Sequence, residues 1–200
     1  MTTANKITIL RILLIPFFVV ELIYYVRTGN EIHWLLAVLS FAIAAICDGV
    51  DGYIARHYNQ KSELGAILDP LADKLLLVSG IVTLSFNNAP YFQQIPLWLM
   101  GTIIGRDLLL GIGSVVIHLV VGKMTVRPRL TGKLATVFQM LVVAWILLQF
   151  DSQPKLLRVW IFGAGIFTGI SGLLYVWDGT KQLGSHPSSS ASKKTSNEHK

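Results

Sequence analysis

Charged residues are scarce in this chain. Asp, Glu, Lys and Arg make up only 14% of its 200 residues, against about 25% in soluble globular proteins. Hydrophobic residues account for 52%, and the mean hydropathy is +0.57. The single cysteine, Cys47, excludes a disulfide framework and a cysteine-based metal site. The composition therefore excludes an ordinary soluble globule and indicates a protein of the lipid bilayer.

Two further absences narrow the class of membrane protein. The first apolar run is not followed by a small-residue cleavage site, so we do not expect a cleaved signal peptide. The chain also has no visible internal repeat, so it gives no support to a transporter built from inverted repeats.

Apolar runs long enough to cross a bilayer occupy nearly the whole chain. A helix needs about 20 apolar residues to span a hydrocarbon core of about 30 Å. Turn-forming residues separate the runs at 28–30, 87–90, 127–129 and 151–154. We therefore predict an all-α, polytopic membrane protein with six transmembrane helices, at residues 7–25, 33–54, 64–86, 95–121, 134–150 and 156–177.

The helices are expected to form one membrane domain, residues 1–183. The remaining residues, 184–200, contain almost no apolar side chain and cannot bury enough surface to offset the entropy lost on ordering. We therefore predict a disordered cytoplasmic tail.

The 17 Lys and Arg residues outnumber the 11 Asp and Glu residues, and the basic ones are unevenly placed. Arg106 lies inside the fourth predicted span. If the N-terminus is in the cytoplasm, thirteen of the other basic residues lie on the cytoplasmic side and only Arg27, Lys155 and Arg158 lie on the opposite side. Because basic residues are retained in the cytoplasm, both termini are predicted to be cytoplasmic. The thirteen are Lys6, Arg11, Arg56, Lys61, Lys74, Lys123, Arg127, Arg129, Lys133, Lys181, Lys193, Lys194 and Lys200.

Four aspartates bracket the predicted cytoplasmic turn between the second and third spans. Asp48 and Asp51 lie three residues apart, and Asp69 and Asp73 lie four apart, so each pair lies on one face of its helix. Small residues on the same faces, Gly52, Ala55 and Gly65, allow the two helices to approach closely. We expect the four carboxylates to converge.

Four converging carboxylates need neutralisation in a medium of low dielectric constant. Two divalent cations would cancel the charge, and ligation by oxygen alone favours Mg²⁺ or Mn²⁺ over zinc. A pair of such ions is suited to phosphoryl-type transfer, and Arg56, close to Asp51, would add a cation for a phosphate. The pattern predicts a two-metal site for a substrate that carries a pyrophosphate.

The sequence leaves two alternative interpretations of these aspartates open. Asp69 followed by Pro70 is also typical of a helix N-cap with a proline in the first turn. Carboxylates inside a membrane also gather along ion or proton pathways, although such residues should be spread over several depths, and these four are expected at one depth.

The same residues carry a family resemblance. The pattern D-x₂-D-G-x₂-A-R-x₈-G-x₃-D-x₃-D, which begins at Asp48 and ends at Asp73, resembles the CDP-alcohol phosphatidyltransferases in every fixed position. The resemblance implies a six-helix membrane enzyme, usually a homodimer. Such an enzyme moves a phosphatidyl-type group from a CDP-linked lipid to an alcohol and releases CMP.

The resemblance also implies roles for individual residues. Asp48, Asp51 and Asp69 would hold the two metal ions, and Asp73 would share in metal binding and accept the proton of the attacking hydroxyl. A further set would bind the CDP-lipid: Gly52, Arg56 and Ser62, with Asn5, Lys6 and Thr8 closing over it.

The acceptor is inferred from basic residues outside this pattern. Lys74, the Arg106-Asp107 pair and the segment around Lys133 resemble phosphatidylglycerophosphate synthases, whose acceptor is glycerol 3-phosphate, so Arg106 and Lys133 would bind its phosphate. Arg106 is alternatively a structural ion-pair partner of Asp107. The Arg-Asp pair also occurs in cardiolipin synthases that use CDP-diacylglycerol and phosphatidylglycerol, and this second acceptor stays open.

Overall fold

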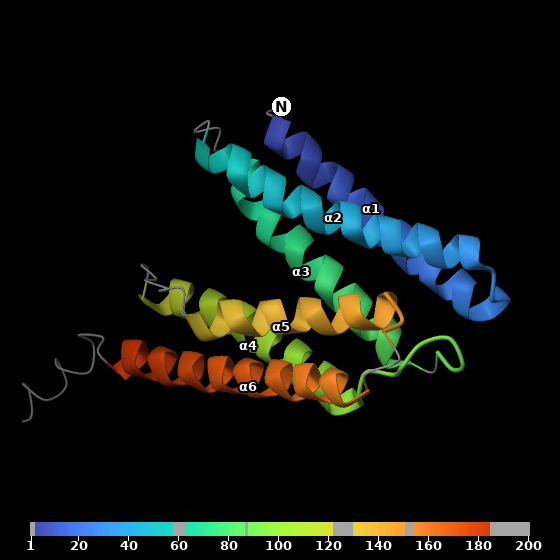
Figure 1. Ribbon diagram of the computed structural model, residues 1–200. Helices are drawn as coiled ribbons and strands as arrows, with labels where there is room; N and C mark the ends of the chain where they lie inside the picture. Colours follow the sequence, from blue (N-terminus) through green and yellow to red (C-terminus); the bar gives the residue numbers. More distant parts are fainter. Residues whose placement is uncertain (1–2, 58–62, 87, 122–129, 151–153, 185–200) are drawn as a thin grey trace, which may run out of the picture.

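The computed structural model describes residues 3–57, 63–86, 88–121, 130–150 and 154–184. Within these ranges the side chains of residues 3–6, 49–57, 63–67, 69, 70, 117, 118, 120, 121 and 181–184 lie outside the description. The described residues form six helices (Figure 1): α1 Thr3–Thr28, α2 Glu31–His57, α3 Glu63–Ser85, α4 Leu97–Val121, α5 Leu130–Leu147 and α6 Pro154–Gly184.

The all-α prediction is confirmed, and each helix covers most or all of one predicted span. Five of them, α1, α2, α4, α5 and α6, are long and apolar enough to cross a membrane. Helix α3 is of similar length, but Asp69, Asp73 and Lys74 lie in its first half. The chain is a multi-pass membrane protein, and α3 carries half of the acidic pattern.

The turn between α1 and α2 follows the chemistry of its residues. Gly29 adopts a positive φ of 68°, and its N–H donates to the Tyr25 carbonyl at 2.8 Å, which ends α1. The side-chain oxygen of Asn30 then accepts from the Ile32 N–H at 3.1 Å and caps α2. The predicted break at 28–30 is confirmed, whereas the one at 127–129 lies outside the described residues.

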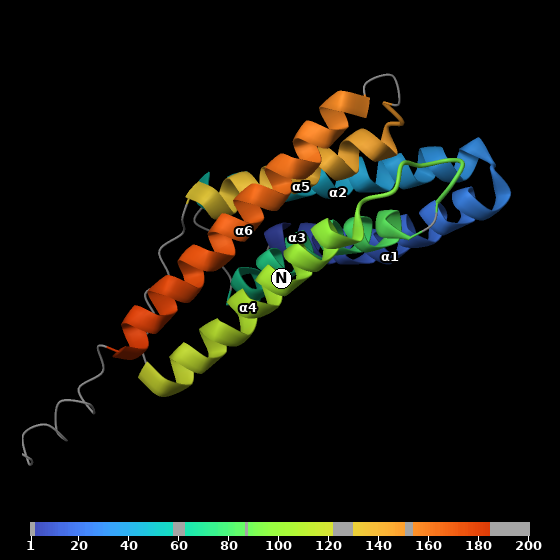
Figure 2. The same ribbon diagram turned by 90° about the horizontal axis from the view of Figure 1, so that it is seen from below.

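The helices form two groups of three. Helix α1 packs on α2 and α3, while α4 and α5 pack on α6, and α3 makes most of the contacts that join the groups. Successive helices run in opposite directions, so the beginnings of α1, α3 and α5 lie at the same end of the bundle as the ends of α2, α4 and α6 (Figures 1 and 2). The two halves of the acidic pattern, on α2 and α3, therefore face the same end.

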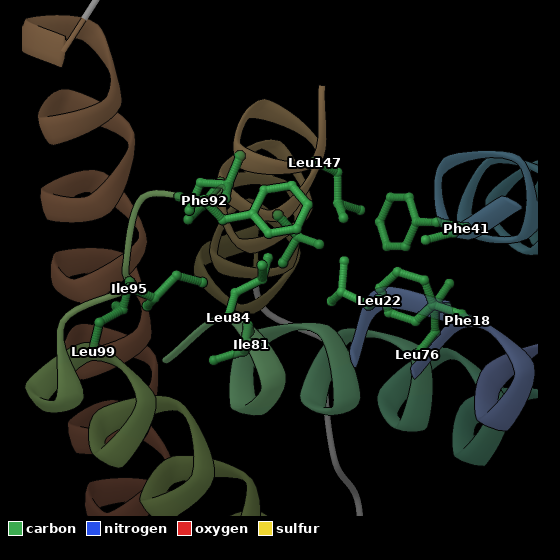
Figure 3. Close-up of a cluster of buried hydrophobic side chains, with 14 of the residues drawn as sticks. Phe18, Leu22, Phe41, Leu76, Ile81, Leu84, Phe92, Ile95, Leu99 and Leu147 are labelled. Atoms are coloured by element: carbon green, nitrogen blue, oxygen red, sulfur yellow. The ribbon is translucent and has the colours of Figure 1, made fainter. Parts of the chain in front are cut away.

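The apolar core lies towards the other end of the bundle (Figure 3). Phe18 and Leu22 of α1 meet Phe41 of α2, Leu84 of α3 and Leu147 of α5 there, and all five are buried. Two hydrogen bonds reinforce this end: Trp34 Nε1 donates to the Leu147 carbonyl at 2.8 Å, and Gln149 Nε2 donates to the Tyr25 hydroxyl at 2.9 Å. The core fixes the helices at this end of the bundle.

Candidate active site

The first aspartate of the pattern is held by a buried cation. Arg11 of α1 donates from Nη1 to Oδ1 of Asp48 on α2 at 2.7 Å. The Arg11 side chain is fully buried, whereas that of Asp48 is 41% exposed. Because α1 and α2 pack side by side, an arginine near the beginning of one helix reaches a carboxylate near the end of the other.

Asp73 of α3 lies within electrostatic reach of this pair. The charges of Asp48, Arg11, Lys74 and Asp107 all act on its carboxylate. The structure therefore brings Asp48 and Asp73 close enough for their charges to interact, although they come from the two ends of the acidic pattern and from different helices.

The other predicted site residues are placed only in part. Asp51, Gly52 and Arg56 lie on α2 and Asp69 lies on α3, but their side chains are outside the description, as are those of Asn5 and Lys6 on α1. Ser62 lies outside the described residues, and Thr8 is fully buried in α1. Among the side chains that are described, no three His, Cys, Asp or Glu residues form a group able to hold a metal ion. Because the side chains of Asp51 and Asp69 are not among those described, the metal site stays a prediction.

The N-cap interpretation of Asp69 is wrong. Helix α3 begins at Glu63, so Asp69 and Pro70 lie six and seven residues inside it and not at its first turn. The carboxylate of Asp69 therefore does not cap the N-terminus of α3.

A second group of charged side chains connects α3, α4 and α6. Lys74 Nζ lies 2.9 Å from both carboxylate oxygens of Asp107, and Arg106 Nη1 lies 2.7 Å from Oδ1 of the same carboxylate. Arg106 Nη2 in turn donates to the Ser171 hydroxyl at 3.0 Å. The interpretation of Arg106 and Asp107 as an ion pair is confirmed. Asp107 also pairs with a second cation, Lys74, which directly follows Asp73 in the sequence.

Helix α5 approaches this group through a glycine. A Cβ atom placed on Gly132 would lie 3.0 Å from Arg106 Nη2, so the backbone of α5 passes close to the guanidinium. Lys133, the next residue, has an exposed side chain. Lys133 therefore lies close to Arg106 in the folded chain, but its side chain is exposed, whereas that of Arg106 is only 10% exposed.

Sequence reasoning missed the carboxylate partners of Arg11 and Lys74. Both were assigned to the cytoplasmic side on charge alone, yet each lies inside a helix with a carboxylate partner. The available signal was the position of Arg11 within an apolar run, since a charge inside a membrane requires a partner. Without these two, the division of basic residues is eleven to three instead of thirteen to three.

A cavity of about 340 Å³ opens beside the second group, between α3 and α4. Its walls are apolar except at Lys74 and Asp107, and the other lining residues are Leu71, Leu75, Val78, Ile104, Leu108 and Leu110. Charged side chains therefore border an apolar surface.

Comparison with known proteins decides the family. The model of the CDP-alcohol phosphatidyltransferase family matches residues 1–171, which include every residue of the acidic pattern and both charged groups. The chain belongs to the CDP-alcohol phosphatidyltransferase family. It is an enzyme of phosphatidyl transfer, as the resemblance of the acidic pattern implies.

Curated relatives in this phosphatidyltransferase family cover nearly the same length. A protein of Escherichia coli (strain K12) named CDP-diacylglycerol–glycerol-3-phosphate 3-phosphatidyltransferase is 30% identical over 174 residues, which are 86% of this chain and 87% of that protein. Proteins of the same name from Salmonella paratyphi A and Salmonella typhimurium are 31% identical over the same shares.

Proposed function

We propose that this phosphatidyltransferase moves the phosphatidyl group of CDP-diacylglycerol to glycerol 3-phosphate, giving phosphatidylglycerophosphate and CMP. The name of the curated relatives supports this donor and acceptor. The observation that carries the proposal is the buried guanidinium of Arg106 next to the helix of Asp73. Its side chain is only 10% exposed, and among the described residues its Nε has no hydrogen-bond partner. A buried donor of this kind suits the phosphate of a small anionic acceptor.

We further propose that Asp48, Asp51, Asp69 and Asp73 hold two Mg²⁺ or Mn²⁺ ions. The donor set fits because carboxylate oxygens are the ligands that these ions prefer, and because Asp48 and Asp73 lie within electrostatic reach of each other. When bound, the ions would polarise the pyrophosphate and stabilise the CMP leaving group.

The chain's own side chains then have separate tasks in the proposed reaction. Gly52, Arg56 and Ser62, with Asn5, Lys6 and Thr8, bind the CDP moiety of the donor. Arg106 and Lys133 bind the acceptor's phosphate and hold its hydroxyl towards the donor's phosphorus. A new P–O bond forms as the bond to CMP breaks, and Asp73 accepts the hydroxyl proton.

The acceptor assay tests this proposal directly. The purified protein is incubated with labelled CDP-diacylglycerol and, in separate reactions, with glycerol 3-phosphate, phosphatidylglycerol, serine or inositol. We expect CMP release with glycerol 3-phosphate, and only background release without an acceptor. Release with phosphatidylglycerol alone would instead assign the protein as a cardiolipin synthase, and release with serine or inositol alone would contradict a phosphate-bearing acceptor.

We also propose that both termini and the active site face the cytoplasm and that the enzyme is a homodimer. The orientation rests on the excess of basic residues at the end of the bundle that carries the termini. The homodimer rests on the family resemblance alone.

Cysteine labelling in intact cells tests the orientation. In a Cys47→Ser background, Leu130→Cys places an exposed thiol at the beginning of α5, and Glu31→Cys places one at the beginning of α2, at the opposite end of the bundle. A membrane-impermeant maleimide should label Glu31→Cys in intact cells and Leu130→Cys only after the cells are opened. The reverse pattern would place the site on the outer face.

A further inference from the structure

Two hydrogen bonds hold the guanidinium of Arg106. Nη1 donates to Asp107 at 2.7 Å, and Nη2 donates to Ser171 of α6 at 3.0 Å. The space beside Nη2 is closed by Gly132 of α5, where a Cβ would lie 3.0 Å away. The guanidinium is thus held from its own helix and from α6, with the backbone of α5 close by, while its Nε keeps no partner among the described residues.

Asp107 is shared between two cations from different helices. Its Oδ1 accepts from both Arg106 and Lys74, and its Oδ2 accepts from Lys74 as well. The carboxylate is 17% exposed, so water screens these charges only weakly. Without its negative charge the two cations would repel each other and separate. Asp107 is therefore the group that keeps Arg106 beside α3.

The Asp107 carboxylate also links Arg106, the proposed ligand of the acceptor's phosphate, to the helix that carries Asp73. Lys74 follows Asp73 directly on α3, and the charges of both Lys74 and Asp107 act on the Asp73 carboxylate. Because α3 and α4 belong to different groups of three helices, the contact between Lys74 and Asp107 also sets how those groups lie at the site.

We infer that Asp107 and Ser171 are positioning residues that orient the guanidinium of Arg106 for the phosphate of the acceptor. This inference rests on the proposed function of Arg106. Neither residue touches the substrate in this account. Each acts on the acceptor only through the guanidinium, so its replacement should have little effect once Arg106 itself has been changed.

A double-mutant cycle between Asp107 and Arg106 is the experiment. Asp107→Asn should raise the KM for glycerol 3-phosphate by about 10- to 100-fold, since a charge-assisted contact is lost, and should leave the KM for CDP-diacylglycerol within about twofold. In an Arg106→Lys background the same Asp107→Asn change should alter the KM for glycerol 3-phosphate by no more than about twofold. Additive effects of the two changes, or equal effects on both substrates, would overturn the inference.

Ser171→Ala removes a hydrogen bond to Arg106 without removing any charge. It provides a second test that can be used if Asp107→Asn does not fold. Loss of one neutral hydrogen bond should raise the KM for glycerol 3-phosphate by about 2- to 10-fold. The matched control is Ser114→Ala, which removes an exposed hydroxyl that bonds only the backbone of its own helix α4 and should change neither KM. An unchanged KM in Ser171→Ala would contradict the role given to Ser171.

The outcome separates this inference from the proposed function. If the wild-type protein releases no CMP with glycerol 3-phosphate, the proposed function fails. The cycle is then run with the acceptor that the wild type does use. Coupling between Asp107 and Arg106 with that acceptor would still support the positioning role, and independence would refute it.

Discussion

In excess EDTA, CMP release by the purified protein should fall to background and return when Mg²⁺ or Mn²⁺ is restored. The reason is the proposed convergence of four aspartates, of which Asp48 and Asp73 already lie within electrostatic reach of each other. Metal ions typically supply several kcal/mol of charge stabilisation in such a transition state, and each 1.36 kcal/mol is a factor of ten in rate. We therefore expect a loss of at least about a thousandfold. Sustained turnover in EDTA would refute the two-metal site.

Asp48→Asn should cause a loss of similar size when saturating metal is present, because an amide is a much weaker ligand than a carboxylate. The control is Glu31→Gln, the same chemical change at the opposite end of α2 on an exposed side chain, which should leave turnover unchanged. Asp48 is also a partner of the buried Arg11, so detergent size-exclusion must show that the variant remains folded. A folded Asp48→Asn protein with near wild-type turnover would contradict the role of Asp48.

Arg106→Lys should raise the KM for glycerol 3-phosphate far more than that for CDP-diacylglycerol. A lysine keeps the charge but cannot contact Asp107, Ser171 and a phosphate at once, because it lacks the planar set of donors. The loss of a hydrogen bond to a charged group is worth about 1.5–3 kcal/mol, or roughly 10- to 100-fold in the KM.

Lys133→Ala tests the second proposed phosphate ligand in the same assay. The Lys133 side chain is exposed, and exposed charges contribute less than buried ones because water screens them. We expect its effect to be confined to glycerol 3-phosphate and to be smaller than that of Arg106→Lys. If both variants stay folded and weaken both substrates equally, these residues serve the structure or the nucleotide, and the main ground for a phosphate-bearing acceptor is lost.

Much of the fold could be predicted from the sequence because the bilayer restricts the solutions. Runs of about 20 apolar residues must become helices, since every backbone polar group has to be satisfied within its own segment. Gly29 and Asn30 ended one helix and began the next as their backbone and side-chain chemistry requires. The Asp69-Pro70 pair misled the local interpretation, because the helix around it begins six residues earlier.

The sequence by itself determined the six helices, the acidic pattern on α2 and α3, and the family that this pattern indicates, because all three depend on spacing within one or two neighbouring segments. Only the tertiary structure decided which cations meet which carboxylates. Arg11 pairs with Asp48 across 37 positions, Lys74 with Asp107 across 33, and Arg106 with Ser171 across 65. Helical periodicity says which residues share a face, but it does not say which helices pack together. The partners of these charged side chains were therefore fixed by the packing of α1 on α2, α3 beside α4, and α4 on α6.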